Sequence, residues 1–149
     1  MLDLGRTFLQ SVERSPDAIA IVDGALRLTY AQWHDRVRAT AGGLRALGLD
    51  HGDHLLVVLQ NRWEMATLHW ACQLLGVVVT PLNWRAKPEE IDYCLGDSGA
   101  KALVFEPASA EAVGLSSGAA AVPRIGVQGA DTATVTFESL LEGPSYSGE

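Results

Sequence analysis

The sequence predicts an α/β fold: a mainly parallel sheet flanked by helices, with a short antiparallel hairpin near the N-terminus. Three observations within residues 53–105 predict it. Mainly apolar runs of strand length occur at residues 54–59, 77–80 and 102–105, and the second of them is also β-branched. Apolar residues at helical spacing fill both gaps between these runs, and glycine or proline marks the boundaries. Strands that alternate with helices in this way form a parallel sheet with right-handed crossovers.

The first strand and helix of this central unit occupy residues 54–76. Within residues 54–59, the five residues after His54 form a continuous apolar run, which is typical of a strand buried on both faces. We expect Asn61 to cap the following helix, because Glu64 stands three residues later, as a capping box requires. Gly76 lies just past the end of this helix, where a left-handed backbone is needed.

The rest of the central unit repeats this order of strand and helix. Residues 77–80 are β-branched and apolar, so we predict a second buried strand. Pro81 ends it, because proline has no amide hydrogen to donate to a sheet. Pro88 opens the next helix, with acids following at the positive end of the helix dipole, and Gly99 closes it. Residues 102–105 are the third strand.

A short amphipathic helix, a hairpin and a longer helix precede the central unit. The Asp23-Gly24 pair is a turn signal between residues 18–22 and 26–28, which we expect to pair as antiparallel strands. Thr29 caps the long helix that follows, with Gln32 in the capping-box position.

The composition changes after the third strand. We therefore divide the chain into an α/β subdomain, residues 1–106, and an irregular extension, residues 107–149. The extension is expected to hold a weak helix, a strand, a loop and a short helix, at residues 109–115, 124–127, 128–134 and 137–141 respectively. Its last residues, 143–149, read as a polar tail with little to pack.

Composition and charge exclude several classes of function. The chain has 149 residues, 48% of them hydrophobic, and a net charge of −7, so an acidic surface should repel nucleic acid. No apolar run approaches the roughly 18 residues of a membrane helix, and Asp3 does not suit a signal peptide. We predict a cytoplasmic protein without a membrane span. Cys72 and Cys94 lie on different expected helices among apolar neighbours, which indicates buried free thiols.

Recognisable catalytic and metal-binding patterns are absent from the sequence. It contains no lysine-ended phosphate loop, no dinucleotide fingerprint and no nucleophile elbow. The glycine-rich stretch at residues 114–118 lacks a following lysine and is typical of a flexible linker. No histidine has a second ligand at a metal spacing, so we assign no catalytic residue and no metal site. The histidines are His34, His51, His54 and His69.

Arg85 is the polar residue best placed for binding. It follows the expected strand at residues 77–80, and ligands of open α/β sheets gather outside the carboxyl ends of the strands. A guanidinium at this place suits a phosphate group. The other interpretation is an ion pair with Glu89 or Glu90 just downstream, and the sequence leaves both open.

Five short motifs follow one another along residues 4–105. They are Leu28-Thr29-Tyr30-Ala31-Gln32-Trp33, Gly52-Asp53, Asn61 with Glu64, the run from Cys72 to Asn83, and the run from Glu90 to Lys101. In this order they resemble the N-terminal part of the acyl-adenylate-forming superfamily of AMP-binding enzymes. That superfamily includes acyl-CoA synthetases, peptide-synthetase adenylation domains and firefly-type luciferases. The Asn83-Trp84-Arg85 sequence is more similar to the acyl-CoA synthetase branch.

The resemblance implies the N-terminal subdomain of the acetyl-CoA synthetase-like fold and a two-step ligase reaction. In the first step a small-molecule carboxylic acid, acyl or aryl, attacks the α-phosphate of ATP in the presence of Mg²⁺ and gives an acyl-adenylate and pyrophosphate. In the second step a thiol, most often coenzyme A, displaces AMP and forms a thioester. In the acyl-CoA synthetase branch, an arginine at the place of Arg85 can lie near the coenzyme A nucleotide.

The superfamily's phosphate loop, its adenine and ribose motifs and its small C-terminal domain have no counterpart in these residues. We therefore expect a scaffold fragment of an acyl-CoA synthetase, truncated before the phosphate loop, with the remaining part of the same enzyme as its partner. Alone it should be inactive and bind none of these cofactors, and a homo-oligomer formed through its bared surface is left open. The alternative is a free-standing flavodoxin-like α/β binding or regulatory module without catalysis.

Overall fold

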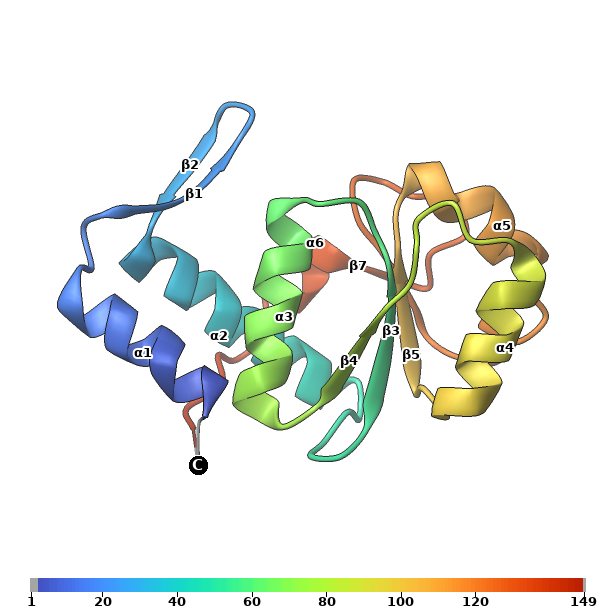
Figure 1. Cartoon of the computed structure of the whole chain (residues 1–149), viewed down its shortest axis with the longest axis horizontal. Helices are drawn as coiled ribbons and strands as arrows, with labels where there is room; N and C mark the ends of the chain where they lie inside the picture. Colours follow the sequence, from blue (N-terminus) through green and yellow to red (C-terminus); the bar gives the residue numbers. More distant parts are fainter. Residues whose placement is uncertain (1–2, 149) are drawn as a thin grey trace.

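The computed structural model describes residues 3–148 and contains the predicted α/β architecture (Figure 1). Within these residues, five parallel strands form one sheet in the order β4-β3-β5-β6-β7. Their bounds are His54–Val58 for β3, Val78–Pro81 for β4, Ala102–Phe105 for β5, Arg124–Gly126 for β6 and Val135–Thr136 for β7. Leu56 lies opposite Thr80 in β4 and Leu103 in β5, which confirms the parallel pairing at the centre of the sheet.

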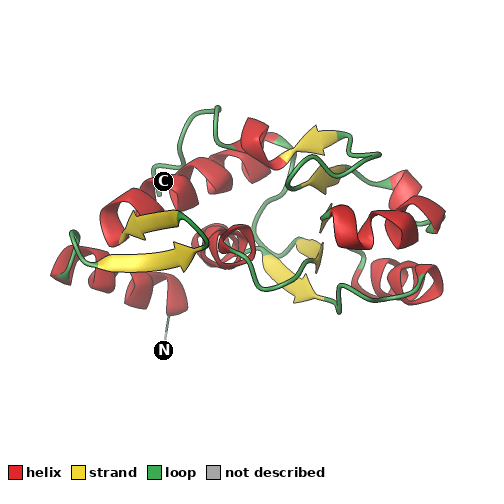
Figure 2. Ribbon diagram, turned by 90° about the horizontal axis from the view of Figure 1, so that it is seen from above, coloured by secondary structure: helices red, strands yellow, loops and turns green. Residues whose placement is uncertain are grey.

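Helices cover both faces of the sheet (Figure 2). One face carries α3, and the other carries α4 and α5. Right-handed crossovers predict this, because the chain adds β4 on one side of β3 and then crosses to add β5 on the other side. The bounds are Trp63–Leu75 for α3, Pro88–Ser98 for α4 and Ala110–Leu115 for α5. Alternate residues of β3 enter two cores: Leu55 and Val57 pack on the α3 side, Leu56 and Val58 on the α4 side.

Further helices lie on the same side of the sheet as α3 and share its core, namely α1 (Leu4–Arg14), α2 (Tyr30–Ala46) and α6 (Phe137–Leu140). The ring of Phe8 on α1 meets Trp33 of α2 edge-on and stacks on Trp70 of α3, with ring centroids 5.2 and 4.9 Å apart. The indole nitrogen of Trp33 donates a 2.9 Å hydrogen bond to the hydroxyl of Thr67, so the polar atom of this buried ring is satisfied. Among residues 3–148, none of the helices combines the length and hydropathy needed to cross a bilayer.

The predicted hairpin is present and extends away from the rest of the molecule (Figure 1). It consists of β1, Ile19–Asp23, and β2, Leu26–Thr29, which pair in antiparallel fashion. The predicted capping box starts α2: the hydroxyl of Thr29 accepts from the N–H of Gln32 at 3.2 Å, and the side-chain oxygen of Gln32 accepts from the N–H of Thr29 at 3.0 Å.

Two predictions about the central unit are wrong. β4 is the edge strand of the sheet rather than a buried one, and Val78 is 44% exposed. Apolar, β-branched composition does not distinguish an edge strand from a central one, because the order of the strands decides which strand lies at the edge. Helix α3 begins after Arg62, not after Asn61, and its own segment supplies no capping side chain. Instead, the carboxylate of Asp23 in the hairpin accepts a 3.0 Å hydrogen bond from the N–H of Trp63, a tertiary contact that local sequence does not encode.

Residues 107–148 continue the same sheet and its helical layers. The predicted helix, strand and final helix are present as α5, β6 and α6, but the sequence does not predict β7, because a strand of two residues has no alternation to detect. The tail was expected to pack little; its described residues are exposed, as expected, except Tyr146, which packs against the core. The N–H of Tyr146 donates to the carbonyl of Arg38 at 3.0 Å, and Arg38 Nε donates to the carbonyl of Tyr146 at 2.9 Å. Gly42 leaves room on α2 for the Pro144 carbonyl, so the tail can lie against this helix.

Candidate functional site

Arg85 lies in the loop that follows the carboxyl end of β4. Its guanidinium is exposed and stacks over the ring of Trp84, with Cζ 4.3 Å from the ring centroid. Its backbone N–H donates to Asn83 Oδ1 at 2.9 Å, which fixes the turn. Within residues 3–148, neither Glu89 nor Glu90 forms an ion pair with it. Of the two interpretations left open by the sequence, the ion pair is therefore not the one observed.

A second polar cluster joins the carboxyl ends of β3 and β5. Glu106 directly follows β5 and is fully buried, and Arg62 lies in the loop between β3 and α3. Arg62 Nε lies 2.7 Å from Glu106 Oε2, and the backbone N–H of Gln60 donates to Oε1 of the same carboxylate. Both donors converge on one acid, so Glu106 ties the end of β5 to the loop after β3.

The backbone beside Glu106 is held separately by Ser109. The Ser109 hydroxyl accepts from the N–H of Glu106 at 3.2 Å and donates to the carbonyl of Val58 at 2.8 Å. Both residues are buried, so these bonds form where water does not compete. The backbone of this corner is thus fixed independently of the Glu106 side chain.

Glu64, in the first turn of α3, is a second buried acid near this edge. Burial raises the pKa of its carboxyl, although its own backbone N–H, the Gln128 amide and the nearby Arg62 charge oppose the shift. Its Oε1 accepts a long 3.5 Å hydrogen bond from Gln128, and its Oε2 has no partner among residues 3–148. Gln128 has a φ of 53°, a left-handed conformation that few residues other than glycine adopt. An ionised Glu64 therefore costs folding free energy.

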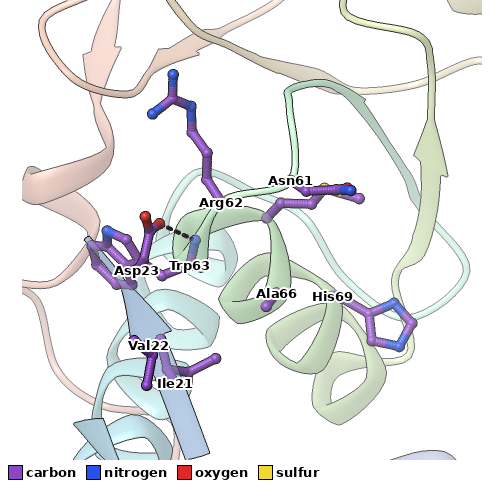
Figure 3. A pocket seen from close by; sticks show the side chains of 9 residues that line it. Ile21, Val22, Asp23, Asn61, Arg62, Trp63, Ala66 and His69 are labelled. Atoms are coloured by element: carbon purple, nitrogen blue, oxygen red, sulfur yellow. Dashed lines mark hydrogen bonds between the residues drawn. The ribbon is translucent and has the colours of Figure 1, made fainter. Parts of the chain in front are cut away.

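An open groove of about 380 Å³ runs between the hairpin and α3 (Figure 3). Val22 of β1 lines one wall, Ala66 and His69 of α3 line the other, and Asp23 closes one end through its bond to α3. The guanidinium of Arg62 points away from the groove (Figure 3). A catalytic site requires polar groups that converge on one point. The polar groups that line this groove do not converge in this way.

The glycine-rich stretch at residues 114–118 is anchored to α4 and is not the flexible linker that the sequence predicts. The carboxylate of Asp92 accepts from the hydroxyls of Ser116 at 2.6 Å and Ser117 at 3.3 Å, and from the N–H of Gly118 at 2.8 Å. These donors, Ser116 foremost, hold the pKa of Asp92 below its ordinary value. The linker prediction is wrong because composition alone does not reveal that an acid on α4 faces the loop.

The two cysteines differ in their surroundings. Cys72 is buried, and burial raises the pKa of its thiol to about 12, so it stays neutral and inert. Cys94 packs against the core on the α4 side but is only half-buried, so the prediction of two buried thiols is wrong for this residue. Both thiols are free. Among the histidines, His34 has its pKa lowered by burial and by the charge of Arg38. No three ligand-type side chains within residues 3–148 converge as a metal site requires.

A parallel sheet covered on both faces, with polar groups gathered at its carboxyl edge, defines a doubly wound α/β protein. Residues 8–144 match the AMP-binding enzyme family, and the chain belongs to this family. The match confirms the resemblance drawn from the five motifs.

Named relatives of the chain include CoA synthetases and CoA ligases. It is 38% identical over 110 residues to feruloyl-CoA synthase of Amycolatopsis sp, and 31% identical over 115 residues to the long-chain-fatty-acid–CoA ligase FadD13 of Mycobacterium tuberculosis. These matches cover 74% and 76% of this chain but 22% and 23% of the two relatives. The chain thus spans less than a quarter of the length of these curated relatives.

Solved structures confirm the fold. The N-terminal domain of FACL13 from Mycobacterium tuberculosis superposes with a TM-score of 0.86 at 27% identity, covering 100% of this chain and 38% of that one. A benzoate CoA ligase from Burkholderia xenovorans LB400 also gives a TM-score of 0.86, at 22% identity, covering 99% of this chain and 30% of that one. The second likeness shows the fold alone.

Reasoning from sequence missed the pair formed by Arg62 and Glu106. A signal for it exists, because both residues stand just beyond the ends of predicted strands, and the carboxyl ends of parallel strands meet at one edge of a sheet. Glu64 was assigned a capping role that it does not have, so its burial went unnoticed.

Proposed function

We propose that this chain is the N-terminal scaffold of an ATP-dependent carboxylate–CoA ligase, which forms an acyl-adenylate and then a thioester with coenzyme A. Membership of the AMP-binding family supports the proposal, as do the relatives named for CoA synthetase and CoA ligase activity. The observation that carries it is the superposition of the whole described fold on the N-terminal domain of FACL13, with a TM-score of 0.86. Activation is needed because a free carboxylate is a poor electrophile.

The contribution of the chain is support and positioning rather than phosphate chemistry. The donors of the glycine-rich stretch at residues 114–118 already bind Asp92, so this loop does not fit the phosphates of ATP. We assign ATP and Mg²⁺, which supply the reactive phosphate and neutralise its charge, to the remaining part of the same enzyme. The carboxylic acid, acyl or aryl, is assigned there as well.

The isolated 149-residue chain is expected to show no ligase activity. Pyrophosphate release from ATP, measured with Mg²⁺, coenzyme A and a panel of aryl and fatty acids, should stay at background. The product of the complete gene should turn over at least one acid of the panel. Turnover by the isolated chain would contradict the scaffold role. A stop codon directly after Glu149 would favour the free-standing α/β module instead.

We further propose that Arg85 contacts the coenzyme A nucleotide in the full-length enzyme. The support is its exposed guanidinium, stacked on Trp84 beyond the carboxyl end of β4, with neither neighbouring acid paired to it. Arg85→Ala is expected to raise the apparent KM for coenzyme A about tenfold, the value of one charge-assisted hydrogen bond, with little change in adenylate formation. Arg27→Ala, which removes an exposed arginine of the hairpin, is the matched control. An unchanged dependence on coenzyme A would remove the proposal.

Three further features stay predictions: a cytoplasmic location, the formation of homo-oligomers, and a boundary near residue 106. Light scattering on the purified chain measures the oligomeric state. Limited proteolysis tests the boundary, and cleavage confined to residues 107–149 would support it. Because β6 and β7 continue the sheet beyond residue 106, both parts contribute strands to one structure.

A further inference from the structure

The sheet changes its direction of growth between β3 and β5. The chain enters at β3, adds β4 on one side, and then crosses over to add β5, β6 and β7 on the other. At such a point the loops after two adjacent strands leave in opposite directions and open a crevice, where ligands of open α/β sheets bind. Here that position lies between the loop that holds Gln60 and Arg62 and the corner at Glu106. We call it the crevice, although the Glu106 side chain fills it and is fully buried.

The crevice holds the carboxylate of Glu106. This side chain is fully buried, and it receives the backbone N–H of Gln60 and the Nε of Arg62, the latter at 2.7 Å. A backbone N–H in a strand-to-helix turn and a guanidinium are the donors that such sites offer to the anionic group of a ligand. In this chain the anionic group is the carboxylate of Glu106, which belongs to the chain itself.

We infer that the crevice between β3 and β5 is an oxyanion-binding site that the chain fills with its own Glu106 carboxylate, and that it binds a free carboxylate of acetate size when this side chain is shortened. The inference rests on the strand order and on the contacts of Glu106. It holds whether or not the proposed ligase function is correct.

The size of the ligand follows from the side chain that it replaces. Beyond Cβ, Glu106 consists of one methylene and the carboxylate, which is acetate less one hydrogen. Glu106→Ala should leave a cavity of that shape, because Ser109 holds the N–H of residue 106 and the carbonyl of Val58 without using the Glu106 side chain. Propionate is longer by one methylene, and a well-packed site tolerates such an addition poorly.

The test is the unfolding of Glu106→Ala in sodium acetate, compared with sodium chloride at equal ionic strength. In chloride the variant should be less stable than the wild type, because a guanidinium and an N–H lose their acceptor. Acetate should restore stability in a saturable way, raising the folding equilibrium constant about tenfold when its concentration is ten times the dissociation constant. Formate should act more weakly, and propionate should act no more than chloride does.

Two variants serve as controls. Glu106→Gln still fills the crevice, and the double variant Glu106→Ala with Arg62→Ala lacks the guanidinium, so neither should respond to acetate more than the wild type does. Shifts of the Gln60 amide signal on acetate addition, seen by NMR only in Glu106→Ala, locate the binding. The inference is overturned if acetate, propionate and chloride act alike on Glu106→Ala, or if this variant stays unfolded at every acetate concentration.

Discussion

Glu64 and Glu106 are two buried acids near one edge of the sheet, and they differ in how far their hydrogen-bond partners compensate the negative charge. Glu106 receives a backbone N–H and a guanidinium, so its charge is compensated. Glu64 receives one long hydrogen bond from Gln128, and its second oxygen has no partner among residues 3–148. At the scale of single residues, the number of converging donors therefore decides whether a buried carboxylate helps or opposes folding.

We expect Glu64→Gln to stabilise the protein at neutral and alkaline pH relative to the wild type. Burial raises the pKa of Glu64 in the folded state above the unfolded value of about 4.3. The stability that this group contributes is fully present below the unfolded pKa and is lost as pH rises through the folded pKa. Glutamine has no proton to lose. Urea unfolding at pH 4 and pH 8 should therefore favour the variant more at pH 8.

The control for this prediction is Glu111→Gln, which removes an exposed acid of α5. It changes the net charge by the same amount without changing a buried group. If Glu64→Gln and the wild type lose stability in parallel between pH 4 and pH 8, Glu64 does not titrate differently in the folded and unfolded states.

Elements whose signals are local were predictable from the sequence, and those set by tertiary contacts were not. The capping box of Thr29 and Gln32 is contained within four consecutive residues, so it could be read directly. The start of α3 could not, because its cap is Asp23, which lies 40 positions earlier in the hairpin. Whether β4 lies at the edge or the centre of the sheet depends on strands that follow it, so its composition carried no information on this.

We expect Asp23→Ala to destabilise the chain by about 0.5–2 kcal/mol, because the N–H of Trp63 loses the side chain that caps it. Asn61→Ala is the matched comparison, since Asn61 is exposed and does not cap the helix. Its free energy of unfolding should change by less than about 0.5 kcal/mol. Chemical denaturation of both variants measures the difference, and the reverse order of effects would restore Asn61 as the cap.

Helix α2 carries two adjacent glycines that its propensity alone disfavours, and the structure gives their reason. A Cβ on Gly43 would lie 2.6 Å from the carbonyl oxygen of Leu140, so only glycine lets α6 approach this closely. We expect Gly43→Ala to cost about 1–3 kcal/mol of stability through overpacking. Gly96 on α4 has no atom within 4 Å of the corresponding position, so Gly96→Ala should instead stabilise by up to about 1 kcal/mol. Thermal unfolding of both variants tests this, and a loss of equal size in each would point to backbone effects alone.

For the whole molecule, the sequence predicts the alternation of strands and helices. It does not predict which strands become neighbours or which side chains from distant segments meet. Residues 55–58 and 102–105 are apolar throughout because β3 and β5 face a core on each side, and this continuous pattern is what predicts the parallel sheet. The position of Arg85 beyond the end of β4 follows from the same pattern. The pairing of Arg62 with Glu106 needs the order of the strands as well, which emerges only when the chain has closed into its sheet.

The position of β4 at one margin of the sheet also bears on how the protein behaves at high concentration. Edge strands invite a neighbouring molecule to add a strand of its own. Here β4 has four residues, of which Pro81 lacks an N–H, and β7 at the opposite margin has two. Neither margin is a long template, so growth into fibrils by stacking of strands is disfavoured. Association between copies should instead depend on side-chain contacts, which dilution can reverse.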